Sequence, residues 1–137
     1  MILFIASNPS HLNEDPKKPF IGSRSEKKFN EWASRLAPNG YKAINVIDTT
    51  TEGNRALKKV EIEDSIIELC EKIKLNENKK IIALGKTAQL AIELAKPILG
   101  EIDYFALPHP SPLNRFLNNR DQVEAILEEC ERWIKNK

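Results

Sequence analysis

The sequence has little cysteine, little net charge and no long hydrophobic run, and each of these absences excludes a class of protein. Its two cysteines, Cys70 and Cys130, are too few for a four-thiolate iron–sulfur cluster, and no CxxC or HxxxH spacing indicates zinc. We therefore expect two reduced core cysteines in a cytoplasmic protein, with no metal and no other cofactor. No apolar stretch approaches the roughly 20 residues of a transmembrane helix. The N-terminal segment also lacks the basic region of a signal peptide, so no membrane partner is expected.

Charge is nearly balanced, because 21 basic residues face 20 acidic ones and the net charge is +1. This balance excludes attachment to nucleic acid or membrane by bulk charge alone, although segregated charges would still make a basic surface. The 41% apolar content is enough for one sizeable core and is not typical of disorder. With 137 residues, the chain is expected to form a single domain over residues 1–137, and a monomer.

Four short apolar runs alternate with amphipathic helical patterns. The runs predict strands over residues 2–6, 41–47, 80–84 and 104–107. Helices are predicted around residues 26–36, 62–73, 86–95 and 123–134, with Ser23 and Glu26 as a capping box and Pro97 ending the third helix. Strict alternation of this kind predicts an α/β fold, a three-layer α/β/α arrangement around a four-stranded parallel sheet.

In such sheets, ligands bind beyond the carboxyl ends of the strands. This rule directs attention to four polar segments, residues 7–25, 45–54, 85–87 and 108–120. The most unusual is the stretch Pro108-His109-Pro110-Ser111-Pro112, in which three prolines stiffen the loop around a histidine. This stretch is either a functional loop or a proline-rich lead-in to the last helix with a surface histidine. The segment Ser7-Asn8-Pro9-Ser10-His11 leaves the first strand in a similar way and is equally compatible with a plain turn.

Together the two segments make the chain resemble the uracil-DNA glycosylase superfamily. That family has a first motif ending in Asp-Pro or Asn-Pro after the first strand and a His-Pro-Ser-Pro-Leu motif after the last. Here they read Ala6-Ser7-Asn8-Pro9-Ser10 and His109-Pro110-Ser111-Pro112-Leu113, on either side of the strand end Ile81-Ile82-Ala83-Leu84-Gly85. The resemblance spans nearly the whole chain, although family members are usually longer. It implies a uracil-DNA glycosylase-like fold and hydrolysis of an N-glycosidic bond in DNA.

The resemblance also implies a mechanism in which the target base is flipped out of the helix into an enclosed pocket. His109 matches the family's hydrogen-bond donor to the departing pyrimidine, which becomes negatively charged. Asn8 falls where the family positions the attacking water. Some branches carry Asp there, while the mismatch-specific and single-strand-selective branches resemble this chain in carrying Asn. An amide orients water but takes no proton, so slower chemistry is expected.

Three further residues are expected to bind the base. Asn45 matches the position whose amide reads the pyrimidine edge, or else is a polar residue at a strand boundary that has shifted by a residue or two. Phe20 is either the aromatic platform for the flipped base or a core anchor for its loop. Ser10 replaces the tyrosine with which the most uracil-specific branch excludes the thymine methyl group, which leaves room for a substituent at C5.

Contacts to DNA follow from the same resemblance. Leu113 corresponds to the apolar wedge that fills the space left by the flipped base. Ser10, His11, Ser111 and Arg115 are candidates for phosphate contacts, which position a strand without reading its sequence. Basic residues also follow each predicted strand end, and we expect them to surround the crevice: Lys17, Lys18, Arg24, Arg55, Lys58, Lys59, Arg115 and Arg120.

The expected partner is therefore DNA, single- or double-stranded, and the expected function is a monofunctional DNA glycosylase acting on uracil or a C5-substituted pyrimidine in base excision repair. Single strands are favoured because base flipping is then cheap. Two alternatives stay open. One is a weakly active or inactive nucleotide- or DNA-binding relative, because a fold alone does not secure a function. The other is an N-glycosidase acting on free nucleosides or nucleotides, which the near-neutral charge permits.

Overall fold

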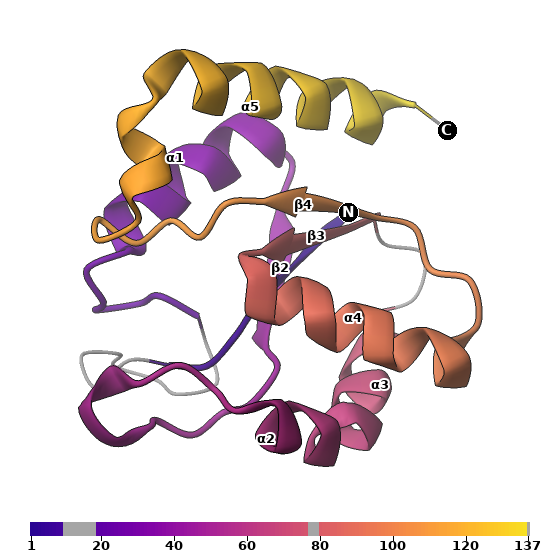
Figure 1. Ribbon diagram of the computed structural model, residues 1–137. Coiled ribbons are helices and arrows are strands. Elements are labelled where there is room, and N and C mark those ends of the chain that lie inside the picture. The colour runs from indigo at the N-terminus through magenta and orange to yellow at the C-terminus, as the bar shows by residue number, and fades with distance from the viewer. Residues whose placement is uncertain (10–18, 77–79, 137) are drawn as a thin grey trace.

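The four apolar runs form one parallel sheet in the computed structural model, which describes residues 1–9, 19–76 and 80–136 (Figure 1). The strands are β1 (Ile2–Ala6), β2 (Tyr41–Asn45), β3 (Lys80–Leu84) and β4 (Tyr104–Leu107), arranged in the order β2-β1-β3-β4. The α-helices are α1 (Glu26–Leu36), α2 (Lys59–Asp64), α3 (Ile66–Lys74), α4 (Lys86–Leu99) and α5 (Arg120–Lys135), with short 3₁₀ helices η1 (Glu52–Asn54) and η2 (Arg115–Asn118). The predicted α/β class with a four-stranded parallel sheet is confirmed.

The central strand β1 is apolar throughout because both of its faces are covered. Phe4 and Ala6 point into a core built with α1 and α5, whereas Leu3 and Ile5 point into a second core built with α2, α3 and α4. Figure 1 shows the same division, with α1 and α5 on one side of the sheet and the other three helices on the opposite side. Successive residues of a strand face opposite ways, so a five-residue apolar run supplies both cores.

The strand order reverses next to β1, and this reversal places the functional crevice. The chain moves from β1 through α1 to β2 at one edge, then returns across β1 to β3 and continues to β4. In open parallel sheets, ligands bind where the strand order reverses, beyond the carboxyl ends of the strands. Residues 7–9 after β1 and residues 85–87 after β3 both lie at this point.

The end of β2 differs from the prediction. The strand was expected to continue to Ile47 but ends at Asn45. Two ladder-like hydrogen bonds nevertheless follow it, because the N–H of Val46 donates to the carbonyl of Ala6 at 2.8 Å and the N–H of Ile47 donates to that of Ser7 at 3.0 Å. These bonds hold Ala6 and Ser7 against the segment that follows β2.

Three helix predictions were wrong. The second predicted helix is divided into α2 and α3 at Ser65, whose hydroxyl donates to the carbonyl of Ile62 at 2.7 Å and so competes with the helical pattern. Pro97 does not end α4, because its fixed φ is helical; the helix ends at Gly100, with φ 84°. Ser23 forms no capping box with Glu26, since its hydroxyl donates to the carbonyl of Phe20 at 2.7 Å.

Within residues 1–9, 19–76 and 80–136, no helix combines the length and the apolar character needed to cross a bilayer.

Candidate active site

A cavity of about 550 Å³ lies at the carboxyl edge of the sheet. Residues 7–9, 23–25 and 54–57 line it, together with Thr87, His109, Ser111 and Leu113. All four segments that the sequence placed at this edge contribute to the lining. The two motifs that carry the sequence resemblance therefore face one cavity although about 100 residues separate them, because parallel strands end at the same edge.

Asn8 lies on the wall formed by the segment after β1. The hydroxyl of Ser7 donates a hydrogen bond to Asn8 Oδ1 at 3.2 Å, and Pro9 beyond it is buried. This bond orients the amide from its oxygen side. The side chain is half-buried and lines the cavity, so its NH₂ group and the second lone pair of Oδ1 are the groups that can bind water there.

His109 lines the cavity from the stiff loop after β4. The backbone N–H of Ser111 donates to His109 Nδ1 at 3.1 Å, and the side-chain amide of Asn114 donates to the His109 carbonyl at 2.9 Å. A nitrogen that accepts a hydrogen bond carries no proton, so the neutral ring bears its proton on Nε2. The loop therefore selects the tautomer that offers a donor at Nε2.

The neutral form of this histidine is favoured by its surroundings. Burial lowers the pKa of His109 below its usual value of about 6.5, because desolvation penalises the imidazolium ion. The rings of Phe20 and His109 are nearly perpendicular, with their centroids 5.8 Å apart. At neutral pH the ring is therefore an uncharged hydrogen-bond donor.

The tip of the same loop carries the predicted wedge. Leu113 is 80% exposed and lines the cavity, and its N–H donates to the hydroxyl of Ser111 at 3.2 Å. Ser111 itself lines the cavity, whereas Arg115 begins η2 as an exposed residue outside the lining. An apolar side chain held this far into solvent has no role in the core.

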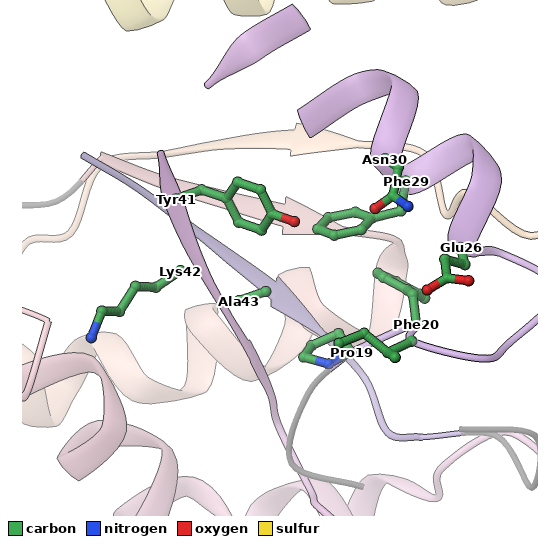
Figure 2. Close-up of a pocket in the computed structure, with 9 residues that line it drawn as sticks. Pro19, Phe20, Glu26, Phe29, Asn30, Tyr41, Lys42 and Ala43 are labelled. Atoms are coloured by element: carbon green, nitrogen blue, oxygen red, sulfur yellow. The ribbon is translucent and has the colours of Figure 1, made fainter. Parts of the chain in front are cut away.

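Phe20 does not line the cavity that Asn8 and His109 share. It is only 7% exposed, packs against Phe29 with centroids 4.8 Å apart, and belongs to the core beneath α1 and α5. It lines a second hollow of about 340 Å³, where Figure 2 shows the rings of Tyr41 and Phe29 beside each other and Lys42 directed away from them. Its φ of 70° is a strained conformation for an aromatic residue. Phe20 is therefore anchored in the core, while its ring also packs against that of His109.

Asn45 is not part of the cavity lining. It ends β2 next to Ala6 and is 1% exposed. Its carbonyl accepts a hydrogen bond from Lys72 Nζ at 3.0 Å, and the same ammonium group pairs with Asp48 at 3.0 Å. The structure therefore buries this residue at the end of β2, outside the cavity lining. The other two predicted site residues, Ser10 and His11, lie outside the described residues.

Positive charge at the cavity is smaller than the sequence pattern indicated. Arg24 and Arg55 line it, but Arg55 forms a two-pronged ion pair with Glu61 at 2.7 and 3.1 Å, which lowers the pKa of Glu61 to about 2. Arg24 is exposed and forms no ion pair within the described ranges. Lys58, Lys59, Arg115 and Arg120 lie outside the lining, and Lys17 and Lys18 lie outside the described residues.

Sequence reasoning missed two hydroxyl groups at this site. Ser25, which immediately precedes α1, is 7% exposed yet lines the cavity, and its side chain makes no capping hydrogen bond to the helix. Thr87 lines the cavity from the first turn of α4. The N-termini of both helices consequently open on the cavity, and their N–H groups attract anions. Both residues fall in segments expected at this edge of the sheet, but a hydroxyl residue next to a helix start is also typical of a cap, so neither was singled out.

Comparison with known proteins adds one finding. A family model described as the Uracil DNA glycosylase superfamily matches residues 1–131. No curated protein and no solved structure matches the chain.

Proposed function

The chain belongs to the uracil DNA glycosylase superfamily, and from this premise we propose that it hydrolyses the N-glycosidic bond of a flipped-out deaminated or C5-substituted pyrimidine in DNA. One observation carries the proposal: Asn8 and a neutral His109 with its proton on Nε2 line the same cavity. A water-binding amide and an uncharged donor are the two groups that this hydrolysis requires.

The chemistry begins with departure of the base. As the bond between the sugar C1′ and the pyrimidine N1 breaks, its electron pair leaves with the base, and negative charge spreads to the O2 carbonyl. His109 Nε2–H donates to that oxygen and stabilises the anion. Because Ser111 already holds Nδ1, no reorganisation is needed as the charge develops. The neutral ring stays a donor throughout and does not transfer its proton.

Water then completes the hydrolysis. Asn8 binds a water molecule on the side of the sugar away from the base, and the water oxygen bonds to C1′. The water proton ends on the departing base, so the products are a free base and an abasic sugar. Asn8 takes no proton at any step, and we expect slower turnover than a carboxylate would give.

The rest of the cavity supplies the means to hold the nucleotide. Leu113 fills the gap that the base leaves in the stack. Ser111, Arg24 and the helix N-termini at Ser25 and Thr87 contact the phosphates. Because few charges on the cavity wall are unmatched, we propose single-stranded or mispaired DNA as the preferred substrate, since its bases flip at little cost.

An oligonucleotide assay tests this proposal. The protein is incubated with single- and double-stranded oligonucleotides that carry uracil, a thymine mispair or a C5-modified pyrimidine, and abasic sites are cleaved with alkali. We expect product with at least one substrate and none above background with the Asn8→Ala/His109→Ala double variant. Equal product from the wild type and the double variant would refute the enzymatic proposal and leave a nucleotide-binding relative.

The second candidate, an N-glycosidase acting on free nucleotides, is favoured by the pairing of Arg55 with Glu61, which removes one phosphate-binding charge from the rim. Salt separates the two candidates. A DNA enzyme that neutralises several phosphates loses affinity steeply as salt rises, whereas a free-nucleoside enzyme changes little. Release of free base from nucleosides at a salt-independent rate, with none from oligonucleotides, would establish the second candidate.

A further inference from the structure

Gly85 lies directly beneath the imidazole of His109. It follows β3, precedes α4, and has φ 92° and ψ 169°. A Cβ placed on it would lie 3.2 Å from His109 Cβ, 3.4 Å from Cδ2 and 3.6 Å from Cγ. The nearest of these distances is shorter than ordinary van der Waals contact between carbon atoms. The histidine thus packs against the backbone of Gly85, and a side chain at residue 85 would crowd it.

The imidazole cannot move away from such a Cβ without losing its own restraints. Pro108 and Pro110 fix the backbone on both sides of it. The Ser111 N–H holds Nδ1 at 3.1 Å, and the Asn114 amide holds the His109 carbonyl at 2.9 Å. Below, the Gly85 N–H donates to the Leu107 carbonyl at 2.9 Å, which ties the strand end to the start of the histidine loop. A Cβ on residue 85 would therefore press on a histidine whose loop is already restrained by prolines and hydrogen bonds.

We propose that Gly85 is a positioning residue for the glycosylase reaction, which sets the depth and tilt of the His109 ring by offering it a surface without a side chain. The inference rests on the proposed function for its catalytic consequence, but the packing itself does not. The tight approach is to His109 Cβ, which carries the ring, so a shift of a few tenths of an ångström at Cβ also moves the donor atom Nε2. Catalytic groups must be held within about 0.5 Å of the productive geometry.

The chain offers a matched control for the test. Gly100, which ends α4, has φ 84° and ψ −165°, nearly the same backbone conformation as Gly85, and a Cβ there would meet nothing within 4 Å. Gly85→Ala and Gly100→Ala therefore carry similar backbone strain but differ in the contact with His109. We expect Gly85→Ala to lower kcat ~10- to 100-fold with little change in KM, and Gly100→Ala to leave kcat unchanged. Equal kcat values in the two variants would overturn the proposal.

A spectroscopic readout reports on the ring directly. Nitrogen-15 NMR distinguishes an imidazole with its proton on Nε2 from the other tautomer, and a His11→Gln background leaves His109 as the remaining histidine of the two in the chain. We expect the wild type and Gly100→Ala to show the Nε2–H tautomer with Nδ1 hydrogen-bonded, and Gly85→Ala to lose that signature. An unchanged His109 spectrum in folded Gly85→Ala would contradict the inference.

A double variant decides the matter if Gly85→Ala is too unstable to assay. His109→Gly removes all three atoms that the added Cβ would approach. In that background, the loss of Tm caused by Gly85→Ala should shrink to the loss caused by Gly100→Ala. An undiminished loss would show that backbone strain alone is responsible and would overturn the proposal. The NMR and Tm outcomes hold even if no oligonucleotide is cleaved, so failure of the proposed function is distinguishable from failure of this inference.

Discussion

Phe20 packs against both the core residue Phe29 and the site residue His109. The substitution Phe20→Leu tests whether it contributes to activity as well as to stability. The substitution keeps an apolar side chain but removes two ring pairs, with Phe29 at 4.8 Å and with His109 at 5.8 Å. At about 0.5–1.5 kcal/mol for each pair, the expected loss of unfolding free energy is about 1–3 kcal/mol. For a domain of this size, that corresponds to a fall in Tm of about 4–12 °C. If the ring also stacks on the flipped base, kcat/KM falls about 5- to 150-fold, since such stacking contributes about 1–3 kcal/mol.

Tyr41→Leu is the control for that experiment. Tyr41 also makes two ring pairs, with Phe4 at 5.4 Å and Phe29 at 5.6 Å, but it makes no ring pair with His109. Thermal unfolding and single-turnover cleavage of a uracil oligonucleotide are measured for both variants, well below the lower Tm. We expect comparable losses of stability and a loss of activity in Phe20→Leu alone. Full activity in folded Phe20→Leu would refute the platform hypothesis and leave Phe20 as a core anchor only.

Three further predictions concern charge. Asn8→Asp should raise the single-turnover rate on uracil at least about tenfold, because a carboxylate accepts the water proton; a slower variant would argue against Asn8 as the water-binding residue. Because the folded-state pKa of His109 lies below about 6.5, the unfolded chain binds more protons under acidic conditions, so stability should rise with pH up to about 6.5 and be lost as pH falls through the folded pKa. Urea midpoints that change with pH identically in wild type and His109→Gln would contradict this. Arg35, which joins α1 to Glu124 and Glu131 of α5, should lose its stabilising effect in 1 M NaCl, so the Tm difference from Arg35→Leu should shrink there; an unchanged difference would point to packing instead.

The strands were predictable because each is a short apolar run bounded by turn residues, and β1 and β3 are buried along nearly their whole length. The runs at residues 2–6, 80–84 and 104–107 coincide with β1, β3 and β4. The errors in the helices arose where the local conformation of one residue differs from what the periodic apolar pattern or the residue type alone indicates. Ser65 interrupts an otherwise continuous amphipathic helix by bonding to the carbonyl of Ile62, and Pro97 stays within α4. Periodicity reports which face is buried and is insensitive to such local bonds.

At the site, the sequence predicted which segments converge but not how each side chain lies. That Asn8 and His109 lie at the same edge follows from a parallel sheet, which the alternating pattern predicts. The burial of Asn45 outside the lining and the packing of Phe20 on Phe29 depend on side-chain packing that no spacing rule contains. From the sequence, Gly85 was recognisable only as the residue that ends a strand. Its relation to His109 depends on a contact between residues 24 positions apart in the chain.

The loop after β4 has a consequence for how the activity of this domain could diversify. The hydrogen bonds that orient His109 come from Ser111 and Asn114, within the same short stretch of chain. Residues 23–25 and 54–57, which also line the cavity, come from other loops. Under the proposed function, substitutions at those positions would alter the surface that meets the nucleotide while leaving the hydrogen bonds of His109 in place. The restraints on the donor and this part of the lining are thus encoded in separate stretches of sequence, and each can vary without disrupting the other.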